Sequence, residues 1–176
     1  MSNNTIPEAL KKGMTTEIWG LNFYRQALER TNDESGKAIF ASLVSEEEAH
    51  LAYLIGEYAA VAGDKGKIIT REDAIELAKS VPPTEIFPEA SQADQLIAKN
   101  ATDLQVLEMA MQFELKGFKF YEVEAAIADT PEAKSVWTFL AAAEDRHYTF
   151  LQKTHEFLAT KGTWYFDNEE KPFFEG

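Results

Sequence analysis

Two segments of the form Glu-x-x-His, Glu47-Glu48-Ala49-His50 and Glu144-Asp145-Arg146-His147, decide the fold of this chain. The second segment follows the first at an offset of 97 positions (144 − 47). The same offset (114 − 17 and 121 − 24) relates Glu17 and Tyr24 to Glu114 and Tyr121. Polar residues that repeat at one offset indicate two similar halves, each with the same side chains facing inward.

Apolar residues recur every three or four positions over four long stretches, which predicts four helices. The expected ranges are about 8–30, 37–62, 102–128 and 131–160, separated by turn-forming residues at 32–36, 63–66 and 129–131. Strand-like alternation of any length is missing from the sequence. We therefore predict an all-α fold, a four-helix bundle made of two helical hairpins.

The segment 63–101 is long enough to cross the bundle from end to end, as ferritin-like bundles require of their one long connection. It contains a predicted short helix at 71–79, capped by Thr70 and Asp73, and a second short helix is expected after Ser91. Prolines at 82, 83 and 88 exclude regular helix between them. We assign residues 1–161 to one bundle domain. The aromatic tail 162–176 is expected to pack along the bundle or at a dimer contact.

The spacing places ligand-type side chains at one depth of the bundle. Glu17 lies 16 residues before Asp33 (33 − 17) and Glu47 lies 14 after it (47 − 33), so two antiparallel helices bring them nearly level. The second hairpin repeats this arrangement around Thr130. Four carboxylates and two imidazoles then converge at the middle: Glu17, Glu47, His50, Glu114, Glu144 and His147.

Buried carboxylates cost several kcal/mol unless they are paired or bound to metal. The predicted inward faces carry no obvious basic partners, so two divalent cations are the expected source of positive charge. Two glutamates plus two Glu-x-x-His pairs are the ligand set of a two-metal carboxylate site in a helical bundle. The alternative is a bundle with a few buried polar residues held by hydrogen bonds.

Other repeated residues lie close to this predicted site. Tyr24 and Tyr121 fall about two turns beyond the isolated glutamates on the same helix faces. They are either hydrogen-bond partners or radical-quenching phenols near the metals, or ordinary core tyrosines. Gly20 and Gly117 also repeat, which favours close helix approach or room near the site. His155 lies outside the repeat and is interpreted as peripheral.

Composition excludes several classes of function. A net charge of −13 argues against nucleic acid as the main partner, since phosphate binding needs a basic face. The absence of cysteine excludes disulfides, iron–sulfur clusters and cysteine nucleophiles within these residues. No stretch has the apolar length of a signal peptide or a membrane span, so we expect a cytoplasmic protein without membrane contact.

The repeated residues resemble those of the rubrerythrin and wider ferritin-like di-iron family. The resemblance implies two iron ions, with Glu17 and Glu114 as terminal ligands, Glu47 and Glu144 as bridges, and one histidine on each iron. It also implies reduction of hydrogen peroxide, or of O₂. Rubrerythrins usually carry a cysteine-ligated rubredoxin domain and an extra glutamate where this chain has Gly117. Without cysteines, electrons are expected from a separate donor protein.

Alternative functions share the same ligand set. Carboxylate-rich ligation also suits manganese, and zinc binds many such sites. The alternatives are therefore a ferroxidase or iron-storage protein, a di-manganese catalase-like enzyme, and a structural metal-binding bundle. A homo-oligomer is expected, namely a dimer whose hairpins the long connection could exchange between chains.

Overall fold

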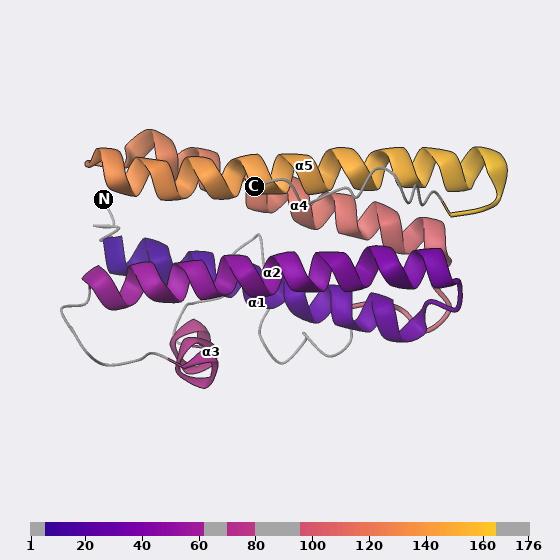
Figure 1. Cartoon of the computed structure of the whole chain (residues 1–176), viewed down its shortest axis with the longest axis horizontal. Coiled ribbons are helices and arrows are strands. Elements are labelled where there is room, and N and C mark those ends of the chain that lie inside the picture. Colours follow the sequence, from indigo (N-terminus) through magenta and orange to yellow (C-terminus); the bar gives the residue numbers. More distant parts are fainter. Residues whose placement is uncertain (1–5, 62–69, 80–95, 165–176) are drawn as a thin grey trace.

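The computed structural model describes residues 6–61, 70–79 and 96–164, and nearly all of these are helical (Figure 1). The helices are α1 (Ile6–Arg30), α2 (Glu34–Val61), α3 (Arg71–Lys79), α4 (Asp103–Ile127) and α5 (Pro131–Lys161). The described ranges contain no strand, which confirms the predicted all-α class. The ranges predicted for the four long helices and for the short one are confirmed to within a few residues.

Polar side chains define where the long helices begin. Thr102 accepts a hydrogen bond from the backbone N–H of Gln105 at 3.2 Å, and the Gln105 side chain accepts one from the Thr102 N–H at 2.9 Å. This is a capping box, as the sequence predicts from a threonine followed three residues later by a glutamine, and it satisfies two N–H groups that would otherwise lack partners. At the start of α2, Asp33 Oδ1 accepts hydrogen bonds from the N–H groups of Ser35 and Gly36, and at the start of α5 the Thr130 side chain accepts one from the N–H of Ala133.

The helices form two hairpins that pack face to face. In Figure 1, α1 and α2 lie together on one side and α4 and α5 on the other. Helix α1 also contacts α4, and α3 packs against α1 and α2. The short helix expected after Ser91 and the proline-rich stretch before it fall mainly in 80–95, outside the described residues.

Two apolar clusters lie on either side of the middle of the bundle. One contains Leu10, Met14, Leu54, Trp137 and Leu140. The other contains Phe23, Phe40, Leu43, Leu107 and Leu151. The residues between them on the four long helices are the predicted polar ones. The hydrophobic effect therefore stabilises the bundle from both ends, and the polar layer lies between two regions closed to water.

The buried face of α4 differs slightly from the inward-facing stripe that the three- and four-residue spacing predicts, namely Leu104, Leu107, Met111, Glu114, Phe118, Tyr121 and Ala125. Leu104, Met111, Phe118 and Ala125 are only partly buried, whereas the fully buried residues include Leu107, Ala110, Glu114, Gly117 and Tyr121. These also follow steps of three and four, but on a face turned slightly around the helix. The reason is that α4 packs against both α5 and α1, so its buried face lies between the directions of the two neighbours.

The start of the aromatic tail packs along the bundle. Trp164 is 8% exposed, and its ring meets Phe40 edge to face with centroids 5.7 Å apart. It also covers Gly36, where an added Cβ would come within 2.7 Å of both Trp164 and Thr31. The other tail aromatics, at 165, 166, 173 and 174, lie outside the described residues.

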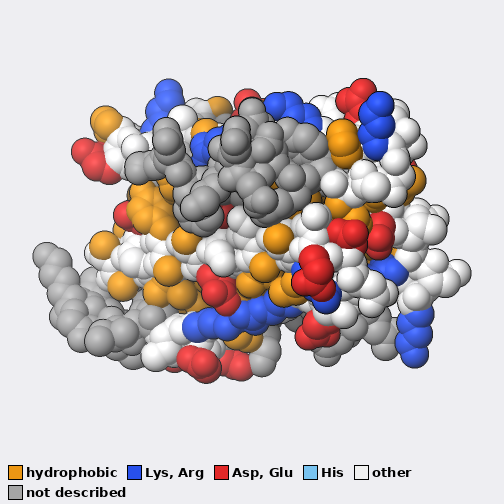
Figure 2. Space-filling view, turned by 45° about the vertical axis from the view of Figure 1, so that its right-hand side comes forward, with side chains coloured by type: hydrophobic (Ala, Val, Ile, Leu, Met, Phe, Trp, Pro, Cys, Tyr) orange, Lys and Arg blue, Asp and Glu red, His pale blue; other side chains and the backbone are white. Residues whose placement is uncertain are grey.

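The surface described here is mixed in character. On the face shown in Figure 2, hydrophobic side chains are interspersed with acidic and basic ones. No helix within the described ranges combines the length and the apolar character needed to cross a membrane.

Two glycines of α2 should respond to alanine in opposite directions. We expect Gly36→Ala to lower the free energy of unfolding by about 1–3 kcal/mol, because the new methyl displaces Trp164 or Thr31. Gly56 is exposed, and no atom lies within 4 Å of an added Cβ. Gly56→Ala should therefore raise the free energy of unfolding by roughly 0.5–1 kcal/mol. Urea unfolding followed by tryptophan fluorescence measures both. An unchanged Gly36→Ala protein would contradict the packing of Trp164 on α2.

Candidate metal centre

The six predicted ligand-type residues meet at the middle of one chain. They come from the central turns of α1, α2, α4 and α5, and none is more than 4% exposed: Glu17, Glu47, His50, Glu114, Glu144 and His147. Their proximity follows from the hairpin geometry, because equal distances from each turn place the side chains at one level.

The histidines relate the two halves by an approximate twofold symmetry. Nδ1 of His50 lies 3.3 Å from Oε2 of Glu17 and 3.9 Å from Oε1 of Glu144. In the same way, Nδ1 of His147 lies 3.3 Å from Oε2 of Glu114 and 3.8 Å from Oε1 of Glu47. Each imidazole therefore faces a glutamate of its own hairpin and one of the other hairpin.

These side chains form two overlapping groups of four. One group is Glu17, Glu47, His50 and Glu144, the other is Glu47, Glu114, Glu144 and His147, and in each the ligand atoms lie within 4.8 Å of one another. Metal–ligand bonds of about 2.0–2.2 Å place ligands on opposite sides of an ion about 4.4 Å apart. Since Glu47 and Glu144 belong to both groups, the arrangement fits two neighbouring ions with two shared carboxylates.

Some buried oxygens of the cluster lack a hydrogen-bond donor, which is also consistent with a site for bound cations. Oε2 of Glu114 and Oε1 of Glu144 are buried and accept no hydrogen bond from the described residues. A buried carboxyl oxygen without a hydrogen-bond donor is costly, and a divalent ion would supply the missing partner. The donor set of oxygens and imidazole nitrogens suits iron, manganese or zinc.

The glutamates differ in their pKa values. Burial, together with the negative charge of neighbouring glutamates, raises the pKa of Glu47 and of Glu144 well above the ordinary value. Burial also acts to raise the pKa of Glu17 and Glu114, but their contacts with His50 and His147 outweigh it, and the net shift is downward. Without metal, the two shared glutamates therefore keep their protons to higher pH than Glu17 and Glu114 do.

Each tyrosine connects the two hairpins. The hydroxyl of Tyr24 donates to Oε1 of Glu114, and the hydroxyl of Tyr121 donates to Oε1 of Glu17. Burial and nearby glutamate charges raise both tyrosine pKa values well above the ordinary one, so the phenols stay protonated. These contacts agree with the predicted hydrogen-bonding role, while a role in quenching radicals stays a prediction.

The repeated glycines leave room for the shared carboxylates. A Cβ at position 20 would lie 2.9 Å from Oε2 of Glu47, and one at position 117 would lie 2.6 Å from Oε2 of Glu144. This matches the expectation of room near the site. A small cavity reaches the carboxylates between α1 and α4, lined by Thr16, Gly20, Phe113 and three of the glutamates.

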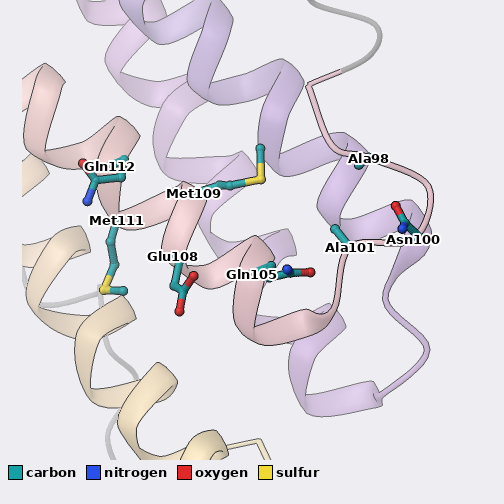
Figure 3. A pocket seen from close by; sticks show the side chains of 8 residues that line it. All are labelled: Ala98, Asn100, Ala101, Gln105, Glu108, Met109, Met111 and Gln112. Atoms are coloured by element: carbon teal, nitrogen blue, oxygen red, sulfur yellow. The ribbon is translucent and has the colours of Figure 1, made fainter.

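Some residues lie apart from this cluster, and one lies unexpectedly near it. His155 pairs with Glu108 at 3.3 Å, and both are partly exposed, as expected for a peripheral histidine. A larger surface hollow along α4, lined in part by Glu108, Met109 and Met111, contains none of the six (Figure 3). Glu46, by contrast, approaches His147, although the repeat does not predict it because position 143 is alanine.

The pKa shifts predict how the stability of metal-free protein depends on pH. Since the raised pKa values let the folded state keep protons on Glu47 and Glu144 that the unfolded state releases above pH 4.5, the free energy of unfolding should fall as pH rises from 4.5 toward neutral pH. Urea unfolding across this range measures it. The double variant Glu47→Gln/Glu144→Gln should show a flatter dependence. A wild-type stability that rises with pH would contradict protonation of these groups.

Substitution of the repeated glycines should weaken metal binding without unfolding the protein. Gly20→Ala or Gly117→Ala displaces the carboxylate of Glu47 or Glu144, so we expect an affinity loss of roughly tenfold or more. Alanine also favours helix by about 1 kcal/mol, so the metal-free protein should remain folded. Calorimetric titration with Mn²⁺ measures the affinity, and Gly56→Ala is the matched control. Equal affinities in all three variants would contradict this role of the glycines.

Comparisons with known proteins agree with this arrangement. A solved structure of a hypothetical protein from Pyrococcus furiosus has a similar fold, with a TM-score of 0.69 and 24% sequence identity over 93% of this chain and 96% of that one. A search of curated proteins found no match. The family model for rubrerythrin matches residues 8–155, which include all four long helices for most of their length and every residue of the cluster. On the strength of that match, this chain belongs to the rubrerythrin family.

Proposed function

We propose that this protein is a di-iron oxidoreductase that reduces hydrogen peroxide to water, with electrons from a separate donor protein. The observation that carries the proposal is the pair of overlapping four-residue groups that share Glu47 and Glu144. Membership of the rubrerythrin family, a family of di-iron carboxylate proteins, supports iron as the metal.

Each residue of the cluster has a place in this proposal. Glu17 and Glu114 would each bind one iron, Glu47 and Glu144 would bridge the two, and His50 and His147 would each complete one iron's ligands. When bound, the two ferrous ions supply the two electrons that, with two protons, convert one hydrogen peroxide into two waters.

The surrounding residues orient the ligands and control access. Tyr24 and Tyr121 hold the outer carboxylates in place through their hydroxyl groups, and neither loses its proton at neutral pH. The apolar clusters at both ends exclude bulk water. The cavity beside Gly20 and Phe113 is small, which favours a small oxidant over an organic substrate.

The amino-acid composition indicates how electrons would reach the proposed iron site. The 176 residues contain no cysteine, so they cannot hold a rubredoxin-type or iron–sulfur centre of their own. We therefore propose a separate electron-donor protein.

We also propose a homodimer as the working assembly.

The deciding experiment compares two oxidants. Protein loaded anaerobically with Fe²⁺ is mixed with one equivalent of hydrogen peroxide or of O₂, and the near-ultraviolet absorption of oxidised iron is followed by stopped flow. We expect two irons per chain and oxidation by peroxide at least tenfold faster. An equal or faster reaction with O₂ would overturn the peroxidase proposal in favour of an oxidase or ferroxidase.

Metal analysis of the same samples separates the remaining alternatives. Many irons per chain in a large assembly would indicate iron storage. Manganese retained after growth with both metals would indicate a catalase-like enzyme. Tightly held zinc would indicate a structural site. His147→Ala tests the proposed ligand, and His155→Ala, which removes a histidine outside the cluster, is the matched control. The first should reduce the iron content to about one per chain, and the second should leave two.

A further inference from the structure

Glu46 lies on the outer side of the two histidines. It precedes Glu47 on α2, so its side chain leaves the helix in a different direction from the inward-facing carboxylate. Its Oε2 lies 4.0 Å from Nε2 of His147, and its side chain is 14% exposed. Together Glu46, His50 and His147 form a third group whose ligand-type atoms lie within 4.8 Å of one another.

The orientation of His147 defines what Glu46 can do. Nδ1 of this ring faces Glu114 at 3.3 Å and Glu47 at 3.8 Å, which is the side where the proposed metal would lie. Nε2 is on the opposite edge of the ring, toward Glu46. A neutral imidazole that binds metal through Nδ1 carries its proton on Nε2. A carboxylate at that edge fixes the tautomer, orients the ring and strengthens the metal bond.

We propose that Glu46 is a positioning residue whose carboxylate accepts a hydrogen bond from Nε2–H of His147 and holds Nδ1 toward the metal. The gap of 4.0 Å closes by a small rotation of the partly exposed glutamate or by one bridging water. The inference rests on the metal site of the proposed function and is independent of the oxidant.

The same residue makes the two halves unequal. The position that corresponds to Glu46 in the second half is Ala143 (46 + 97), which is fully buried and has no carboxylate to offer His50. His50 meets the edge of Phe139 instead, with ring centroids 6.1 Å apart at 86°. Glu46 lies within 4.8 Å of a ring nitrogen of His50 as well, but its ion-pair contact, at 4.0 Å, is with His147. We therefore expect the ion held by Glu114 and His147 to be bound more tightly than the ion held by Glu17 and His50.

A third metal ion on Glu46 is the competing interpretation of this group. It would require both ring nitrogens of His147 to bind metals, which leaves the imidazole without a proton. A hydrogen bond to Glu46 needs only the neutral ring. The geometry of these three side chains therefore favours positioning over ligation.

Titration with Co²⁺ alone tests the inference, because Co²⁺ reports its sites by colour and does not turn over. Wild type should bind two ions with unequal affinities. Glu46→Ala should weaken the tighter site by roughly 10–100-fold and leave the weaker one unchanged. Glu46→Gln should lie closer to wild type, since its amide oxygen accepts the same bond. Glu48→Ala is the matched control, because it removes the same charge from an exposed neighbour on α2 that pairs with Arg25.

A spectroscopic readout separates positioning from general damage. The Co²⁺-loaded protein should show a hyperfine-shifted, slowly exchanging N–H proton of His147, and Glu46→Ala should speed its exchange with water. Helix content and melting temperature of the metal-free variant should match those of Glu48→Ala.

Three other results of the Co²⁺ titration would contradict either the role of Glu46 or the metal site itself. If wild type binds two ions and Glu46→Ala binds both as tightly as Glu48→Ala does, the positioning role is wrong and the metal site stands. If wild type binds three ions and Glu46→Ala two, Glu46 is a ligand and the positioning role is wrong. If wild type binds none, the proposed metal site fails and the inference fails with it.

Discussion

The burial of four carboxylates at one level of a helical bundle is the constraint on which the rest of this structure depends. Each would cost several kcal/mol in an apolar interior without a partner. The histidines and tyrosine hydroxyls satisfy part of this requirement, and buried oxygens of Glu114 and Glu144 still lack donors. The apolar clusters on both sides provide the folding free energy that makes such a layer tolerable. The proposed metal ions would complete an arrangement that the fold already holds in place.

Neither hairpin completes this layer alone. Tyr24 of the first hairpin donates to Glu114 of the second, and Tyr121 of the second donates to Glu17 of the first. Each four-residue group likewise takes a carboxylate from the opposite hairpin. Because each group combines residues of both hairpins, metal binding would be thermodynamically linked to the pairing of the hairpins. The link applies equally whether the two hairpins belong to one chain, as here, or to two.

The sequence predicts the helices well because the spacing of apolar residues, the turn-forming residues and the capping residues all indicate the same helix boundaries. Thr102 with Gln105 is an example. The six ligand-type residues could be found because duplication repeats them at one offset. The face of α4 could not be placed correctly, since a stripe on one helix does not reveal that two neighbours share its packing. The crossed tyrosine contacts and Glu46 also escaped prediction. A repeat detects only what both halves share, and Glu46 corresponds to Ala143.

Gly117 explains how this chain departs from the pattern that the rubrerythrin resemblance implies. That pattern has an additional glutamate at this position, but here a Cβ would lie 2.6 Å from Oε2 of Glu144. The shared carboxylate occupies the space, just as Glu47 occupies the space beside Gly20. A ligand exchange that uses a glutamate at position 117 is therefore closed to this chain. Its inner ligand set is symmetric, and the proposed asymmetry between the two metal positions would come instead from Glu46 on the outer side of His147.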